Sequence, residues 1–352
     1  MPYNKGGTSL KASLFERIIN HINKIIKDEK QINEHKDEEK SFSRYRYFTF
    51  NVLVTFFMTN LQKGLQREIL LFKEAIESDG GSIPEVSKAA FSKARMKLKP
   101  SAFSSLSDIV TEDFYNSGEQ KTWHGCRLLA VDRSRVVLPN SKEIKDTYGI
   151  FKTHKDNKEI SRGRTILVYD VLNHLTLYGA MGTMKQSEKA MLWDCLPDLK
   201  LNSKDILIFD RGYPSHLLFL YLQKLKVQFC FRMQKDWWKD IERFYNSGKA
   251  SAIVTLALPE RENESAAELG ITEKKFKCRL VRVELEGGET EILLTSLLDE
   301  RAFSVADMKE LYGLRGPLRM HTKRSNIKSA WVIFPANRKS QFCKIFMSKY
   351  LS

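Results

Sequence analysis

Two aspartates that follow short apolar segments could together perform metal-dependent chemistry. Asp132 follows the apolar residues 129–131, and Asp210 follows the apolar residues 206–209. Such runs predict buried strands of an α/β sheet, where functional groups collect just outside the strand ends. If the two strands are neighbours, their carboxylates converge, and paired carboxylates suit Mg²⁺ or Mn²⁺. Two such ions would activate an attacking oxygen and stabilise a leaving oxygen in phosphoryl transfer. The alternative is that each aspartate only ends a strand or forms a turn.

The elements around these aspartates predict an α/β domain. Strands are expected at 126–131, 165–172, 175–181, 205–210 and 227–233, with a helix at 216–226. This order of strands and helices indicates a sheet with buried central strands. Two further apolar segments, at 274–285 and 291–297, flank a pair of glycines and predict a β-hairpin within a β-rich insertion.

The N-terminal part of the chain has helical rather than strand periodicity. Apolar residues recur at helical spacing in 10–27, and 50–76 is expected to form two helices that break near Gly64. A helix predicted at 86–99 carries several cations, among them Lys88, Lys93 and Arg95. It resembles the second helix of a helix-turn-helix motif, which enters the major groove of DNA. The alternative is a basic helix face that contacts only solvent.

Charge and composition restrict the class of protein. The 352 residues carry a formal net charge of +15, and the sequence pI is about 9.4, which favours a polyanionic partner such as nucleic acid. The hydrophobic fraction of 42% is ordinary for a folded protein, and no apolar run approaches the ~20 residues that span a bilayer. The five cysteines are scattered without metal-ligand spacing, so we expect reduced thiols and a cytoplasmic protein without a membrane partner.

Three motifs resemble those of the DDE transposases of bacterial insertion sequences. Asp132-Arg133-Ser134 resembles the first-aspartate motif, with Arg133 in place of the usual glycine. Residues 210–215, Asp-Arg-Gly-Tyr-Pro-Ser, are similar to the second-aspartate motif. The third motif has Tyr, two residues, Arg, three residues, Glu, six residues and Lys, and it begins here with Tyr312 and Arg315.

The resemblance implies an RNase H-like mixed sheet with a β-rich insertion, preceded by an all-α DNA-binding domain. We therefore expect a helical domain at 1–105, a catalytic domain at 106–233 and 301–352, and the insertion at 234–300. Asp132 and Asp210 would be catalytic residues and would hold two Mg²⁺ or Mn²⁺ ions. The expected partner is double-stranded DNA, both element ends and target, bound by a homodimer in the bacterial nucleoid.

The same resemblance suggests which residues bind DNA. Tyr312 and Arg315 would hold DNA near the active site. Arg211 would contact a phosphate or pair with an acid. The N-terminal helix with Lys88, Lys93 and Arg95 would recognise the end repeats.

The third motif is broken after Arg315. Arg319 stands where the family has its catalytic Glu, Asn326 stands where it has Lys, and no acidic residue follows Glu310. Back-translation shows that one extra T before the Gly316 codon permits a Trp-Pro-Ile-Glu stretch with both family residues restored. We therefore expect that a one-base deletion shifted the reading frame after Arg315. The alternative is a genuinely divergent basic tail.

The sequence thus predicts a transposase that cleaves DNA at insertion-sequence ends and transfers strands, impaired in this copy by loss of its third acid. One alternative is a catalytically inactive remnant that still binds specific DNA. A host RNase H-like nuclease is a third possibility, against which the N-terminal helices and the Tyr312–Arg315 pair argue.

Overall fold

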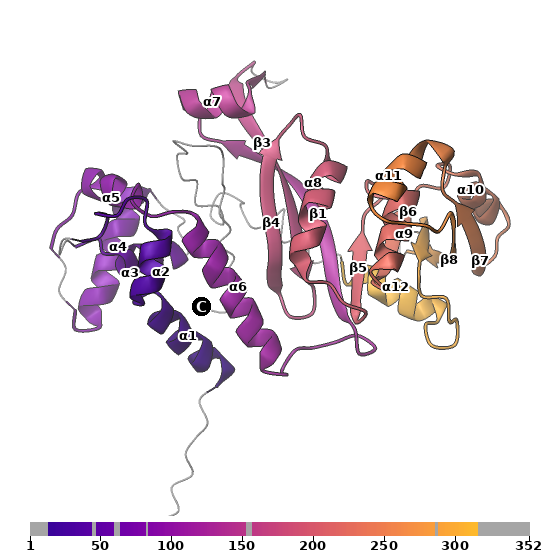
Figure 1. Ribbon diagram of the computed structural model, residues 1–352, viewed down its shortest axis with the longest axis horizontal. Coiled ribbons are helices and arrows are strands. Elements are labelled where there is room, and N and C mark those ends of the chain that lie inside the picture. The colour runs from indigo at the N-terminus through magenta and orange to yellow at the C-terminus, as the bar shows by residue number, and fades with distance from the viewer. Residues whose placement is uncertain are drawn as a thin grey trace, which may run out of the picture. The chain divides into compact units, whose positions relative to one another are not determined.

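The computed structural model describes residues 13–43, 47–59, 64–81, 84–152, 157–285 and 288–315. The chain forms two compact units that divide between Gln120 and Lys121. In Figure 1 the first unit is helical, whereas the second contains the strands. Among the helices of the described residues, none is long and apolar enough to cross a membrane.

The first unit packs its helices around an aromatic core. Phe91 lies against Phe56 with 4.7 Å between ring centroids, and Phe57 lies 5.8 Å from Phe103. Phe103 belongs to the last helix of the unit, which runs past the expected domain boundary at residue 105 as far as Asn116. The break expected near Gly64 is confirmed. The helices are α1 (Leu14–Ile25), α2 (Glu29–His35), α3 (Phe50–Met58), α4 (Leu65–Ser78), α5 (Lys88–Arg95) and α6 (Ser101–Asn116).

Helix α5 is shorter than the 86–99 expected from the sequence. It begins after Ser87, whose Oγ accepts a hydrogen bond from the amide of Ala90 at 3.2 Å. It ends at Arg95 because the next residues form a bridge in which Leu98 pairs with Lys36. Backbone bonds to a second segment thus replace the bonds that would have continued the helix.

The second unit is built on one nine-stranded mixed sheet in the order β2-β3-β1-β5-β6-β9-β8-β7, with β4 on β3. Strands β1, β5 and β6 are parallel, and β3 is antiparallel to both of its long neighbours, β1 and β4. This is the mixed sheet expected of an RNase H-like core. The strands are β1 (Arg127–Leu138), β2 (Phe151–Lys152), β3 (Glu159–Asp170), β4 (Leu175–Thr183), β5 (Asp205–Phe209), β6 (Gln228–Met233), β7 (Ser251–Ala257), β8 (Lys275–Glu284) and β9 (Thr290–Thr295).

The β-rich segment extends this sheet. The expected hairpin is confirmed as β8 and β9, and β9 pairs directly with β6. Residues 234–300 therefore continue the sheet of the core, since their strands hydrogen-bond to it in one uninterrupted order. They also carry α10 (Lys239–Asn246) and α11 (Asn263–Glu268).

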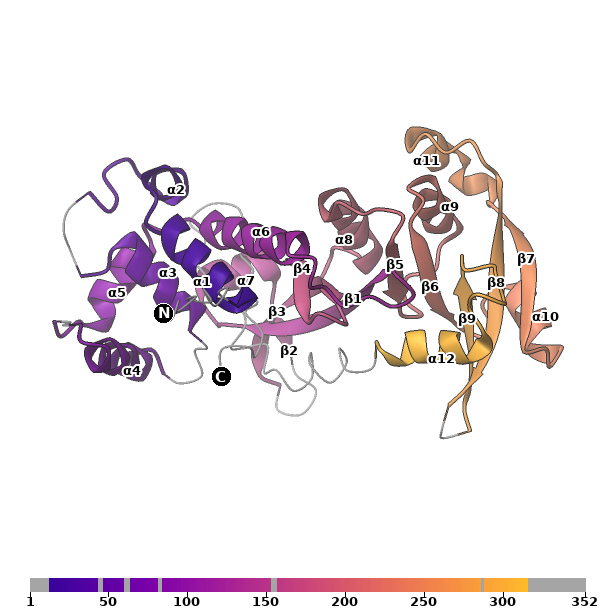
Figure 2. The same cartoon turned by 90° about the horizontal axis from the view of Figure 1, so that it is seen from below.

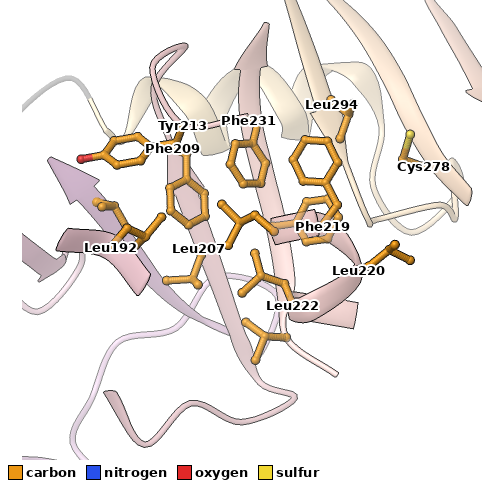
Figure 3. Close-up of a cluster of buried hydrophobic side chains, with 14 of the residues drawn as sticks. Leu192, Leu207, Phe209, Tyr213, Phe219, Leu220, Leu222, Phe231, Cys278 and Leu294 are labelled. Atoms are coloured by element: carbon orange, nitrogen blue, oxygen red, sulfur yellow. The ribbon is translucent and has the colours of Figure 1, made fainter. Parts of the chain in front are cut away.

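Helices cover both faces of the sheet (Figure 2). Helices α8 (Glu188–Cys195) and α9 (His216–Lys224) lie on one face, where their apolar residues pack against Leu129, Phe209 and Phe231. Figure 3 shows this cluster, with Tyr213 at one margin and its hydroxyl pointing away from Leu294. Helix α12 (Val305–Gly313) lies on the opposite face. The remaining helix, α7 (Lys142–Tyr148), follows β1.

Candidate active site

The register between β1 and β5 places the two aspartates side by side. Arg127 pairs with Asp205 and Ala130 pairs with Ile208, so a constant offset carries the parallel register to Asp132 and Asp210. Asp210 directly follows β5, as expected. Asp132 lies within β1 and not at its end, because β3 continues to pair with β1 as far as Leu138.

Both carboxylates lie on the face covered by α12. Side chains alternate along a strand, so Asp132 shares the face of Leu128 and Ala130, and Asp210 shares that of Ile206 and Ile208. These four apolar residues form one cluster with Met308 and Leu311 of α12. Packing of α12 against this face brings its C-terminal end to the two aspartates.

Arg315 bridges the two carboxylates. Its Nη2 lies 3.2 Å from Oδ1 of Asp132, and its Nη1 lies 3.9 Å from Oδ2 of Asp210. The same Nη2 donates to the Val131 carbonyl at 3.3 Å. The Arg315 side chain is only 3% exposed, so in this cluster the cation and Asp132 are buried, whereas Asp210 is partly exposed.

Tyr312 completes this side of the cluster. Its hydroxyl donates to Oδ1 of Asp210 at 3.5 Å, a long hydrogen bond. Burial raises the pKa of Tyr312, and the negative charge of Asp210 acts in the same direction against the opposing effect of Arg315. The phenol therefore stays protonated and acts as a donor to the carboxylate.

Two charged residues that sequence reasoning missed extend the cluster across the sheet. Arg232 of β6 lies 3.9 Å from Oδ1 of Asp210 and forms an ion pair with Glu291 of β9. Glu291 is 7% exposed and faces the α12 side of the sheet, like its strand neighbour Leu293. One signal in the sequence could have identified them. Buried strands are normally continuous apolar runs, and each of these two strands contains a single charged residue.

Comparison with known proteins identifies the family. The model of the family described as Transposase DDE domain matches residues 123–317, more than half of the chain. The chain belongs to the DDE transposase family. The Escherichia coli K12 transposase InsG of insertion sequence element IS4 is 24% identical over 247 residues, which are 68% of this chain. The chain spans only 53% of the length of that relative.

Two solved structures show weaker likeness. One is the piggyBac transposase synaptic complex with hairpin DNA, at a TM-score of 0.46 and 10% identity, covering 92% of this chain and 70% of that one. The other is the NurA nuclease of Sulfolobus solfataricus, at a TM-score of 0.26 and 11% identity, covering 63% and 98%. Both scores are too low to support a functional comparison.

Of the remaining residues predicted from the sequence, Arg211 contacts the carboxylates through its backbone. The amide of Arg211 donates to Oδ1 of Asp210 at 2.9 Å, whereas its side chain is exposed. Arg319 lies outside the described residues. In the helical unit, Lys88 and Lys93 are exposed on α5, whereas Arg95 is half-buried and burial lowers its pKa. DNA contacts of these side chains remain predictions.

One feature of the two aspartates in this DDE domain is compatible with binding of a divalent cation. A cationic side chain already lies between them, which shows that the pair accepts positive charge. In the described part of the chain, however, no three residues among His, Cys, Asp and Glu gather into a group that could hold a metal ion. The described residues thus present two of the expected three acids, and the single positive charge of Arg315 offsets one of their two negative charges.

Proposed function

We propose that this chain is a DNA transposase of an insertion sequence, built to cleave DNA at the element ends and to transfer the freed strands into target DNA. One observation carries the proposal: Asp132 and Asp210 lie at matching positions of the register between parallel β1 and β5, and both pair with Arg315. This arrangement occurs within a domain that matches the DDE family.

Each part of the chain has a role in this proposal. Asp132 and Asp210 would hold Mg²⁺ or Mn²⁺ when Arg315 withdraws from between them. The bound metal would activate the attacking water or 3′-hydroxyl and stabilise the leaving oxygen. The exposed Lys88 and Lys93 of α5 would bind the element's end repeats, and a homodimer would hold two ends together.

We further propose that this copy is impaired by a shifted reading frame. The family match ends at residue 317, two residues beyond Arg315, and no acidic residue follows Glu310. The reading frame that one added T restores permits the acid that Arg319 replaces. The gene sequence across codons 315 to 345 tests this directly. A frame that no single added T can restore would refute it.

A second candidate function is an inactive protein that binds element ends. It is favoured by the described residues themselves, since these contain no group of three acids that could hold a metal ion, and Arg315 lies between the two aspartates. Such a protein would occupy end repeats or join assemblies of intact subunits without cutting.

The deciding experiment compares three purified chains on duplex DNA that carries the element's end repeats, in Mg²⁺ and in Mn²⁺. The chain as it stands should bind without cleavage. The frame-restored chain should cleave at the ends and transfer strands, and its Asp210→Asn variant should bind without cleaving. Cleavage that survives Asp210→Asn would refute the site. Failure of the frame-restored chain to cut would select the binding protein, and cutting of DNA without repeats would favour a nuclease.

A further inference from the structure

Four arginines gather on the face of the sheet opposite the aspartates. Beyond the end of β5, β1 continues to Leu138 and remains paired with β3. In this extension Arg135 lies directly opposite Arg164. Arg133 and Arg162 lie on the same face of the same two strands, because each is two residues away from one member of that pair. We call Arg133, Arg135, Arg162 and Arg164 the arginine face.

The arginine face has little compensating negative charge. Glu188, the first residue of α8, pairs with Arg133 and lies 3.8 Å from Arg164. Within the described ranges, no carboxylate lies at ion-pair distance from Arg135 or Arg162. Four cations therefore share one carboxylate, which leaves a local charge of +3.

This arrangement is electrostatically unfavourable for the protein alone. Like charges directly opposite each other on neighbouring strands destabilise a sheet. The pKa of Arg164 is lowered, first by burial and then by repulsion from Arg135 and Arg133. The Nε of Arg164 is buried and has no hydrogen-bond partner in the described structure. An anion bound across the arginine face would relieve all three unfavourable features.

The arginine face adjoins the second-aspartate motif. The guanidinium of Arg133 lies so close to Gly212 that a Cβ at this glycine would come within 2.8 Å of Nη1. Gly212 is two residues from Asp210. The arginine face thus begins beside the loop that follows Asp210 and extends away from it along β1 and β3.

We propose that the arginine face is a docking surface for the phosphate backbone of double-stranded DNA. This inference rests on the proposed function, because that function names DNA as the polyanion. Arginine forks suit phosphate groups, which they bind with two parallel hydrogen bonds. Contacts to the backbone position DNA without reading its sequence. The surface would therefore serve element ends and target DNA alike.

Salt dependence of binding tests this role. Each phosphate contact contributes about 0.9 to the slope of log K against log salt, so Arg135→Gln with Arg162→Gln should lower the slope by about 1.8. Between 50 and 200 mM salt, the affinity advantage of the unmodified chain should accordingly shrink by about 12-fold. The probe is a duplex without end repeats, measured with the full-length chain.

A control variant removes two exposed cations that lie two residues apart on another strand. Lys275→Gln with Lys277→Gln makes the same charge change on β8, which β5, β6 and β9 separate from β1. This control should leave the slope nearly unchanged. Urea unfolding at low salt gives a second readout, since loss of Arg135 should maintain or raise the midpoint by relieving repulsion.

Each result of these binding measurements supports or refutes the role of the arginine face in DNA docking. An unchanged slope in the arginine variant, or an equal fall in the lysine variant, would refute the docking surface while leaving the proposed function intact. If the unmodified chain does not bind DNA at all, the proposed function and this inference both fail. If the arginine variant loses binding to polyglutamate but not to DNA, the arginine face binds an acidic protein, and its role in DNA docking is refuted.

Discussion

Removal of Arg315 should convert the aspartate pair from a protein ion cluster into a metal site. At an effective dielectric constant of about 20, the 3.2 Å pair with Asp132 is worth roughly 5 kcal/mol before desolvation is counted. The 3.9 Å pair with Asp210 is worth roughly 4 kcal/mol on the same basis. A metal ion can enter between the carboxylates only by replacing most of this attraction.

Arg315→Gln removes the cation and leaves two carboxylates facing each other. In chelator, the free energy of unfolding should fall by about 3–5 kcal/mol, the usual cost of removing one partner from a buried ion pair. Mn²⁺ at roughly 100 times its dissociation constant should then restore about 2.7 kcal/mol. The unmodified chain should gain far less at the same Mn²⁺ concentration.

Urea unfolding with and without Mn²⁺ measures both the stability lost with Arg315 and the stability regained with Mn²⁺. Titration calorimetry measures the dissociation constant of Mn²⁺ directly. The exposed Arg301, changed to Gln, is the control for loss of one positive charge. An equal Mn²⁺ effect on the unmodified chain and on Arg315→Gln would show that Arg315 does not compete with the metal. No Mn²⁺ effect on either chain would show that two aspartates do not make a metal site.

Three further predictions concern stability and reactivity. Asp205 is 1% exposed and bonds Arg127 at 2.7 and 2.9 Å, so Asp205→Asn should lower the free energy of unfolding by about 3–5 kcal/mol in urea titrations. Burial lowers the pKa of His216, so the unfolded chain binds its proton at higher pH, and stability should fall as pH drops through 6.5. His216→Gln should flatten that profile, and an unchanged acid limb would contradict this assignment. Burial raises the pKa of Cys278 to about 12, so its thiol should resist alkylation at pH 8 until urea unfolds the chain, as mass spectrometry of labelled peptides can show.

The sequence predicted the two aspartates because each follows a short apolar run, a strictly local signal. It also predicted the strand that ends before Asp210 and the hairpin of β8 and β9. It did not predict that β1 continues beyond Asp132. The residues that follow Asp132 directly are polar, Arg133, Ser134 and Arg135, and their pairing with β3 identifies them as a strand.

The sequence did not predict the contacts that surround the aspartates. Arg232 and Glu291 are far apart in the chain, and only the pairing of β6 with β9 places them together. The positions of Tyr312 and Arg315 were expected from a motif, but their partners were not. The motif implied contact with DNA, whereas in the folded chain both side chains bond to the aspartates.

The charge balance of the cluster connects the family motif to the proposed impairment. Asp132 and Asp210 contribute two negative charges and Arg315 one positive charge, while Arg232 and Glu291 cancel each other. The net charge of −1 attracts a divalent cation only weakly. An acid at position 319 would bring the sum to −2, which a divalent ion neutralises, whereas Arg319 in the same place would bring it to zero. Restoration of an acid at position 319 would thus favour a metal ion at this arrangement, and the frame-restored chain should therefore bind Mn²⁺ more tightly than the chain as it stands.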